Sequence, residues 1–458
     1  MKRTIGFIVA GLILVLLFSC ASSTGVSKSE YAKTQNMMKT DDAAMSVASI
    51  KSQADSYKDK VLYYLDLGMA QLYAGQYQEA VDSFEVAQDA IDEYGIASVS
   101  ENVEALLVND YSIAYPGEKY EELLVNIFSA IAYYMMGNEE DAMVELRQAE
   151  VIYRDFKANM QEQEGFLEKL VLAITPNPFR YLDVPKVKDF TGSNLASYMS
   201  LIMYRNNKDL SNASVDLNRI KGSDSYAGAV NEDEINVESG KVRVNLVSFE
   251  GLIGQKKGIQ VMVPGSNGAN HVVSWPWFEP STSQIKSVTL TCSNGQSVNT
   301  AVLEDFNDIA LRALAMEVKV SYLKSFYRGY TKVTAAKAAA DEAYEAAVKA
   351  ADAAYSAAMS KNKLAGMLAG AARSSALDAA EDARSKALEE VNKTEVADTR
   401  MGQYLPARVS VAGLSLDPGT YDFTVTYKLS GGSDIVRTFT GVEVSEGKSN
   451  LIFASCAK

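Results

Sequence analysis

The sequence YLDLGMAQLYAGQYQEAVDSFEVA, residues 64–87, decides the first half of the fold. Apolar and small residues recur in it every three to four positions, which is the period of a helix with one buried face. Gly75 interrupts this pattern at the point where the chain must reverse. Gly68 and Ala80 are small enough to let two helices approach, and Phe84 is expected to fill the space beside them. The stretch therefore predicts an antiparallel helical pair.

The same spacing returns twice further along the chain. In a second copy, Gly137, Ala142 and Ala149 repeat the positions of the glycine and alanines of the first, and residues 198–220 hold a third, degraded copy. Recurring helical pairs with small residues at the crossings are typical of tetratricopeptide (TPR) arrays, the alternative being an unrelated antiparallel hairpin. Because three such units bury a continuous core and leave a concave face, we predict a TPR-like helical domain over residues 56–225.

Tyrosines are frequent in the predicted helical pairs. One from each copy, Tyr64, Tyr133 and Tyr204, is a candidate lining residue of a groove that binds a peptide or a glycan. The competing interpretation is that these side chains simply belong to the core.

At Lys241 the periodicity changes from that of helices to that of strands. Apolar and polar residues then alternate, and two apolar runs end at Pro-Gly and Ser-Asn-Gly turn sequences. Strand patterns return near residue 405 after a long helical interruption. We therefore predict a β-sandwich-like domain in two parts, residues 241–303 and 397–458.

The interruption, residues 304–396, is rich in alanine and helical in period. Its larger side chains fall on one stripe: Tyr344, Val348, Ala351, Tyr355 and Met359. The repeat of about 3.67 residues per turn favours a straight or slightly right-handed coil. A reversal at residues 361–363 predicts a long projecting hairpin, and residues 364–372 are apolar but too short to span a bilayer. We favour a helix contact there over a membrane-dipping tip. The predicted fold class is α+β.

Residues 17–20, LFSC, end a basic and then apolar N-terminal segment. Lys2 and Arg3 precede the apolar run, and small polar residues follow Cys20. This order is typical of a bacterial lipoprotein signal peptide over residues 1–19, after which Cys20 receives a diacylglyceryl group and usually an N-terminal palmitate-type acyl chain. The apolar run is too short for a transmembrane helix, and an ordinary secretory signal does not require a cysteine. Such lipid chains anchor a protein firmly to a bilayer.

Ala21, directly after the cysteine, favours the outer membrane, with the body in the periplasm or at the cell surface. Residues 20–55 lack a strong apolar period and are interpreted as a tether that runs into a first helix. Fully extended, such a tether reaches at most about 120 Å.

The chain is acidic. Its formal charge is −14 over 458 residues, and removal of Lys2 and Arg3 with the signal makes it −14 − 2 = −16. Such a charge is poorly suited to nucleic acid or to an anionic lipid surface as a partner. Outside the cytoplasm, Cys292 and Cys456 are a candidate disulfide, with two unpaired thiols as the equal alternative.

Motifs for catalysis or metal binding are missing from the sequence. His271 is the single histidine, which weakens any Ser-His-Asp, Cys-His or histidine–metal proposal, and we expect it in a turn or at the surface. There is no glycine-rich phosphate loop and no Cys-x-x-Cys motif. We predict no enzyme activity, no cofactor and no metal, although carboxylates are too numerous for counting to exclude a glycosidase pair.

Short motifs in a particular order resemble a family of uncharacterised bacterial lipoproteins. They are Tyr115-Pro116-Gly117-Glu118-Lys119-Tyr120-Glu121, Gly137-Asn138 with Ala142, Asn177-Pro178-Phe179, Ala397-Asp398-Thr399-Arg400 with Leu405-Pro406, and Leu416-x-Pro418-Gly419-x-Tyr421. The family pairs a TPR-like half with a C-terminal β segment, and the chain departs from it at residues 401–404, where an aromatic residue usually follows the Ala-Asp-x-Arg motif. Members are often encoded near penicillin-binding-protein activator lipoproteins, which implies work in the cell envelope and no known activity. Asp398 and Arg400 are then expected to pair or to contact a partner.

Three functions are compatible with these observations. The first is a lipid-anchored scaffold or adaptor that binds an envelope protein through its TPR-like domain, in outer-membrane or peptidoglycan biogenesis. The second is a glycan-binding lipoprotein resembling SusD-type receptors, although two neighbouring tryptophans make a poor sugar platform. The third is a cell-wall hydrolase.

Overall fold

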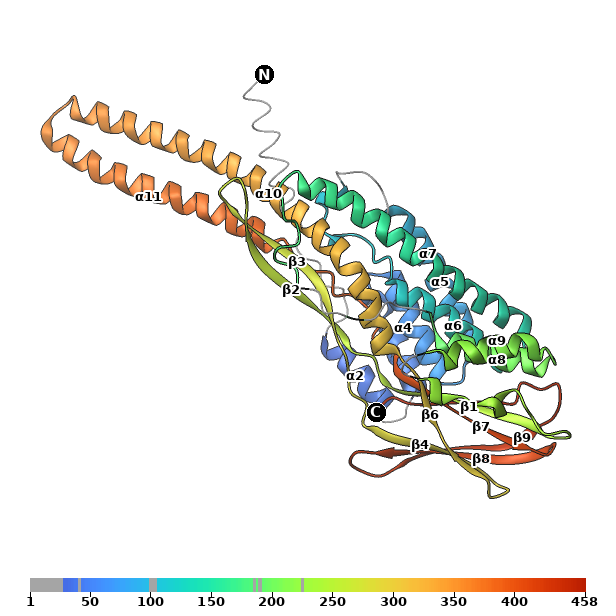
Figure 1. Ribbon diagram of the computed structural model, residues 1–458. Coiled ribbons are helices and arrows are strands. Elements are labelled where there is room, and N and C mark those ends of the chain that lie inside the picture. Colours follow the sequence, from blue (N-terminus) through green and yellow to red (C-terminus); the bar gives the residue numbers. More distant parts are fainter. Residues whose placement is uncertain (1–27, 40–42, 99–104, 184–186, 188–191, 224–225) are drawn as a thin grey trace.

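The computed structural model describes residues 28–39, 43–98, 105–183, 187, 192–223 and 226–458, so the predicted signal peptide and Cys20 lie outside the described residues. Its helices are α2 (Lys28–Lys39), α3 (Ala43–Ser52), α4 (Lys60–Tyr73), α5 (Tyr77–Ser98), α6 (Lys119–Met135), α7 (Glu139–Leu172), α8 (Asn194–Asn206), α9 (Leu210–Lys221), α10 (Phe306–Met359) and α11 (Lys363–Lys393). Its strands are β1 (Val242–Leu252), β2 (Gln255–Pro264), β3 (Asn270–Glu279), β4 (Ile285–Cys292), β5 (Ser297–Asn299), β6 (Ala301–Asp305), β7 (Pro406–Leu416), β8 (Gly419–Leu429), β9 (Ile435–Val444) and β10 (Leu451–Cys456). The fold is α+β, as predicted (Figure 1).

Three layers make up the body of the molecule. Two four-stranded sheets, β10-β1-β7-β6 and β5-β4-β8-β9, face each other across a shared apolar core that includes Leu246, Leu290 and Tyr427. The helical array covers the other face of the first sheet, where the Phe249 ring lies 5.3 Å from the Phe128 ring, centroid to centroid. The first sheet is therefore buried on both faces.

This double burial corrects the alternating pattern predicted for the strand after Lys241. Every residue of β1 from Arg243 onward is buried, including the polar ones. Arg243 donates to Glu234 at 2.7 Å, and Asn245 donates to the other Glu234 oxygen at 2.8 Å. Arg243 and Asn245 face the helical array instead of water, and their hydrogen bonds make that burial tolerable.

The three predicted helical pairs are α4–α5, α6–α7 and α8–α9, and their turns are alike. Gly75, Gly137 and Lys208 occupy the same left-handed position, with φ of 69°, 81° and 65°. A Cβ placed on Gly68 would lie 2.5 Å from the ring of Phe84, so this glycine gives the helices their close approach as expected. Tertiary packing thus explains the small-residue spacing.

The hairpin of α10 and α11 forms a long arm that leaves the body (Figure 1). The first half of α10 packs on the body, while the second half pairs with α11. Strands β2 and β3 form a separate two-stranded ribbon laid along α10, with Trp275 against Tyr322 at 5.3 Å between ring centroids. Strands β2 and β3 of the segment 241–303 therefore pack on α10 and are not part of the sandwich.

The tether predicted over residues 20–55 was expected to run into a first helix, and the structure has two helices from residue 28 onward, so the part that can be a tether is shorter than predicted. Helices α2 and α3 begin the described chain and bury Thr34, Val47 and Ile50. The Gln35 amide also donates to the Gln403 carbonyl at 3.3 Å. Sparse apolar residues suffice here because a neighbouring surface of the body covers them.

None of the described helices combines the length and apolar content needed to cross a membrane.

Candidate functional site

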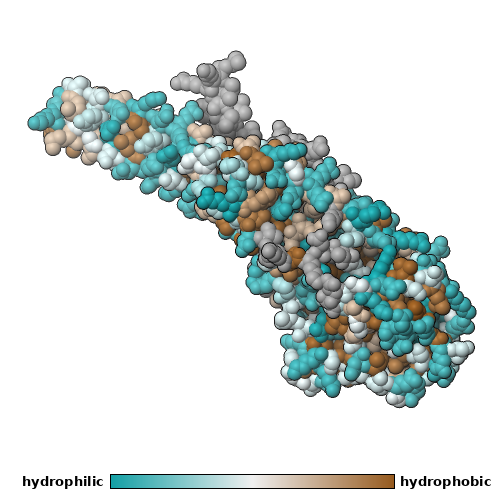
Figure 2. Space-filling view, viewed as in Figure 1, coloured by the Kyte–Doolittle hydropathy of each residue, from teal (hydrophilic) through white to brown (hydrophobic). Residues whose placement is uncertain are grey.

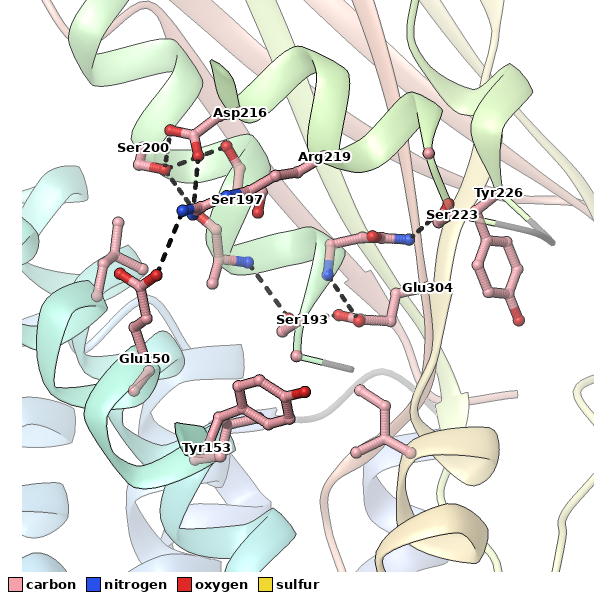
Figure 3. Close-up of a pocket in the computed structure, with 18 of the residues that line it drawn as sticks. Glu150, Tyr153, Ser193, Ser197, Ser200, Asp216, Arg219, Ser223, Tyr226 and Glu304 are labelled. Carbon is pink, nitrogen blue, oxygen red and sulfur yellow. Dashed lines mark hydrogen bonds and ion pairs between the residues drawn. The ribbon is translucent and has the colours of Figure 1, made fainter. Parts of the chain in front are cut away.

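A pocket of about 790 Å³ lies between α7, the α8–α9 pair and the junction of β6 with α10. Figure 3 shows Glu150 and Tyr153 of α7 facing residues of α8 and α9 across it. Helix α7, which is 34 residues long, packs along α10 more extensively than along α8. The third helical pair thus stands apart from the second, and polar side chains line the space between them.

Glu304, at the end of β6, fixes one wall of this pocket. One carboxylate oxygen accepts the Asn194 backbone N–H at 2.8 Å, and the other accepts Ser193 Oγ at 2.6 Å and the Leu195 N–H at 3.2 Å. These N–H groups open α8 and have no partner within the helix, and the helix dipole favours a negative charge there. Ser193 is also the N-cap and accepts the Ala196 N–H. Both Glu304 oxygens are therefore committed to holding α8 on β6.

Burial raises the pKa of Glu304 to about 7, while the hydrogen bonds from the start of α8 oppose that rise. Burial likewise raises the pKa of Asp216 on α9, opposed by the Ser200 hydroxyl, which donates to it at 2.7 Å. Both carboxyls are thus held by donors of α8 or its N-cap. Glu304 thus joins α8 to β6, and Asp216 joins α9 to α8.

Arg219 of α9 lines the pocket and bridges to α7. Its guanidinium lies 3.3 Å from Glu150 and 3.4 Å from Asp216. The Arg219 side chain is 55% exposed and that of Glu150 is 65% exposed. Exposed ion pairs of this kind contribute about 0–1 kcal/mol, so this bridge opens at little cost and frees charged groups for a ligand.

Other groups of the lining have no internal partner among the described residues. The Ser197 hydroxyl and the Arg147 guanidinium make no hydrogen bond or ion pair there, and Tyr226 Oη is likewise unengaged. Burial and the neighbouring Asp305 carboxylate raise the pKa of Tyr226 to about 12, so it stays a neutral donor. Donors, acceptors and aromatic edges are available to a bound molecule, and the lining holds carboxylates and guanidiniums, with carboxylates in excess.

The three tyrosines predicted to share a groove do not lie together. Tyr204 on α8 lines the pocket. Tyr133 on α6 instead donates to Glu85 at 3.0 Å, and Tyr64 on α4 packs edge-on against Tyr63 at 4.9 Å between centroids. The pocket opens on the flank of one helical pair, so equivalent repeat positions do not converge on it.

Asp398 and Arg400 lie in a buried polar seam between the helical array and the second β part. Arg400 Nη2 lies 2.6 Å from Asp398 and Nη1 lies 3.0 Å from Asp59, and the guanidinium also donates to the backbone carbonyls of Asp110 and Ile113. Nearby carboxylates hold the pKa of Arg400 above its usual value, although burial opposes this. The pair joins two parts of the fold and is not exposed to a partner.

Two motifs that are far apart in sequence meet in this seam. Tyr115 lies under the Arg400 guanidinium, 5.1 Å from its ring centroid, and donates to Glu121 at 2.6 Å. Glu121 also accepts the Gly402 N–H at 2.6 Å, and Glu118 pairs with the buried Lys256. The Tyr115–Glu121 motif and the segment that follows Ala-Asp-x-Arg are therefore one structural unit.

The candidate disulfide between Cys292 and Cys456 is not formed, and both thiols are buried in the sandwich core. The Gln284 N–H donates to the Lys458 carbonyl at 3.2 Å, which places the end of β10 beside the start of β4. Cys292 ends β4, eight positions after Gln284 (292 − 284), or about 26 Å along a strand. A bridge needs Cα atoms within about 7 Å.

His271 is also not where the sequence suggested. It is fully buried on β3, with its ring edge-on to Phe326 at 4.8 Å, and burial lowers its pKa to about 4. No cluster of His, Cys, Asp and Glu suited to a metal ion occurs among the described residues.

Sequence reasoning missed Glu304, Arg219 and the start of α8. The Ser193-Asn194 pair before an apolar helical run is an N-cap signal that would have located the start of α8. Nothing in the sequence marks Glu304, because its role arises from a strand end meeting that helix.

Trp275 is 3% exposed, so it offers no surface to a sugar.

Comparison with known proteins gives no assignment. No protein-family profile, no curated protein and no solved structure matches the chain.

Proposed function

We propose that the chain is a lipid-anchored adaptor of the bacterial cell envelope that holds a segment of a partner protein in the pocket beside α8 and α9. The observation that supports this most strongly is the pocket itself, about 790 Å³ in volume and lined by repeat helices. Ser197, Arg147 and Tyr226 offer unpaired hydrogen-bonding groups along its walls, within the described part of the chain.

The lining suits a polypeptide better than a single charged metabolite. A peptide backbone needs donors and acceptors in alternation, and the hydroxyls of Ser197 and Tyr226 act as either. Carboxylates line the pocket in excess, but guanidiniums line it as well, so it offers partners to side chains of either charge. The Arg219–Glu150 ion pair is exposed, so either side chain can leave the other and pair with a charged side chain of the ligand.

A photocrosslinking amino acid at position 204 tests this proposal in cells, with the same amino acid at position 133 as the matched control. Both positions are half-buried tyrosines of the array, but only the first lines the pocket. We expect a discrete protein adduct from position 204 and none from position 133. Ser197→Trp, which fills the pocket, is expected to abolish that adduct, whereas Val144→Trp on the exposed face of α7 leaves it unchanged.

Equal labelling from both positions would remove the pocket from the proposal. Capture of peptidoglycan or another glycan in place of protein would favour the glycan-binding alternative. Turnover of cell-wall material that depends on a pocket carboxylate would instead favour the hydrolase.

The lipid anchor is tested separately. Cys20→Ser is expected to move the chain from the membrane fraction to the soluble fraction without changing its helix content. Persistent membrane association of a folded Cys20→Ser chain would show that another element anchors it.

A further inference from the structure

The end of the α10–α11 arm carries an apolar face that no described residue covers. Leu364, Met367 and Leu368 are 68%, 70% and 69% exposed, although such side chains normally avoid water. They follow the spacing i, i+3, i+4 and so lie on one face of the first two turns of α11. Figure 2 shows the arm from one side, with polar and apolar surface mixed along it.

This face points away from α10. Gly366 and Gly370 lie on the opposite side, where a Cβ on Gly366 would meet the Met359 sulfur and one on Gly370 would come within 3.6 Å of the Tyr355 ring. Small residues therefore close the hairpin, and the larger apolar side chains are left outside. Further along the same outer face stand Ser375, Asp378 and Asp382, all exposed.

The outer apolar face is thus restricted to the tip, and packing within the hairpin does not explain it.

Charge is also unevenly distributed. Residues 353–377 contain no acidic residue although the whole chain carries −14. Arg373 pairs with Asp352, but Lys361 and Lys363, on either side of the loop, are exposed and make no ion pair with the described residues. A basic, apolar tip therefore stands on an acidic protein.

The tip also projects well clear of the body. The last buried residue of α10 is Ala336, and the 23 residues from there to Met359 (359 − 336) span about 35 Å. The tip is the convex end of a helical hairpin and not a groove. A second copy would bring equal positive charges together, which disfavours tip-to-tip pairing.

We propose that this tip, residues 359–371, docks on the surface of an anionic phospholipid bilayer. Leu364, Met367 and Leu368 enter the headgroup boundary, and Lys361 and Lys363 contact the lipid phosphates. This contact is separate from the Cys20 anchor and from the pocket beside α8.

A fluorescent probe at the tip tests the proposal. The full chain with Cys20→Ser and Ala371→Cys is labelled with an environment-sensitive dye, since Cys292 and Cys456 are buried. The matched control carries the probe at Asp382→Cys, on the same outer face but 11 residues (382 − 371), or about 16 Å, further from the tip. Neutral vesicles contain phosphatidylcholine alone, and anionic vesicles contain phosphatidylcholine with about 30% phosphatidylglycerol.

We expect the probe at 371, and not at 382, to brighten with anionic vesicles. Leu364→Ser, Met367→Ser and Leu368→Ser together are expected to weaken binding at least roughly 100-fold, from the loss of buried apolar surface. Lys361→Gln with Lys363→Gln is expected to weaken it about 25-fold on anionic vesicles, at about fivefold per lysine, and little on neutral ones. All these side chains are exposed, so circular dichroism is expected to be unchanged.

Equal brightening at both probe positions, or equal binding to neutral and anionic vesicles, would overturn the proposal. Failure of the chain to co-sediment with any of the vesicles, together with self-association that depends on the tip, would also overturn it. Should the triple variant misfold, the lysine pair still provides the decisive comparison.

Discussion

Arg400 provides the sharpest test of how the two halves of this protein are joined. Arg400→Met keeps most of the side-chain volume and removes the guanidinium. The side chain is 3% exposed, and its loss leaves Asp398 and Asp59 without their cation. Two backbone carbonyls, those of Asp110 and Ile113, also lose donors at 2.7 and 2.9 Å.

The magnitude follows from burial. Breaking a buried ion pair from one side costs about 3–5 kcal/mol, because the remaining charge stays buried without compensation. We expect the free energy of unfolding to fall by that amount in Arg400→Met. The matched control is Arg154→Met, since the Arg154 side chain is 71% exposed and its pair with Asp155 is worth little; we expect a change within about 0.5 kcal/mol.

Urea unfolding measured by circular dichroism at equilibrium gives both values. Addition of Asp398→Asn to Arg400→Met is expected to recover part of the loss, because it removes one of the stranded charges. A loss below about 1 kcal/mol in Arg400→Met would refute the reasoning, since it would mean that water or a rearranged seam satisfies Asp398 and Asp59. Such a result would make a partner-binding role of Arg400 worth testing.

Three further predictions concern the repeats and the pocket. Gly68→Ala is expected to lower stability by about 1–3 kcal/mol in urea unfolding, because the new Cβ would lie 2.5 Å from the Phe84 ring; an unchanged midpoint would contradict that packing. Lys208→Gly is expected to raise the melting temperature by about 2 °C, since a lysine there holds φ at 65°; a lower melting temperature would argue against backbone strain. Because burial raises the pKa of Glu304 to about 7 from 4.5, the folded state takes up a proton between these pH values and stability falls as pH rises. Relative to wild type, Glu304→Gln should gain up to about 1.4 kcal/mol per pH unit across that window, and parallel curves for the two proteins would rule this out.

Local periodicity was enough to predict the helical pairs and the arm. Gly75 and Gly137 mark turns that reverse the chain, and both adopt positive φ. The arm was predicted equally well, because the predicted reversal at residues 361–363 falls within one residue of the gap between α10 and α11. Such features depend on residues near one another in sequence.

Features that depend on distant segments were not predictable in the same way. Arg243 and Asn245 look like solvent-facing positions of an amphipathic strand, yet Glu234 and the helical array surround them. The pocket depends on Glu304 meeting the start of α8, a contact across more than a hundred residues. The charge of Glu304 gives no sign of that meeting, because a carboxylate at a strand end is more often solvated.

The packing of α2 changes what the lipid anchor implies. Residues 21–27 alone separate Cys20 from α2, and seven residues (27 − 21 + 1) reach at most about 25 Å. If Cys20 carries the proposed lipid, this length keeps α2 close to the bilayer, whereas a longer tether would let the body move through a wide volume. Reach then comes from the arm, whose free part extends about 35 Å and is held straight by paired helices. The proposed anchor near the body and the proposed docking of the basic, apolar tip at the far end of the arm would together fix the orientation of the pocket toward a partner.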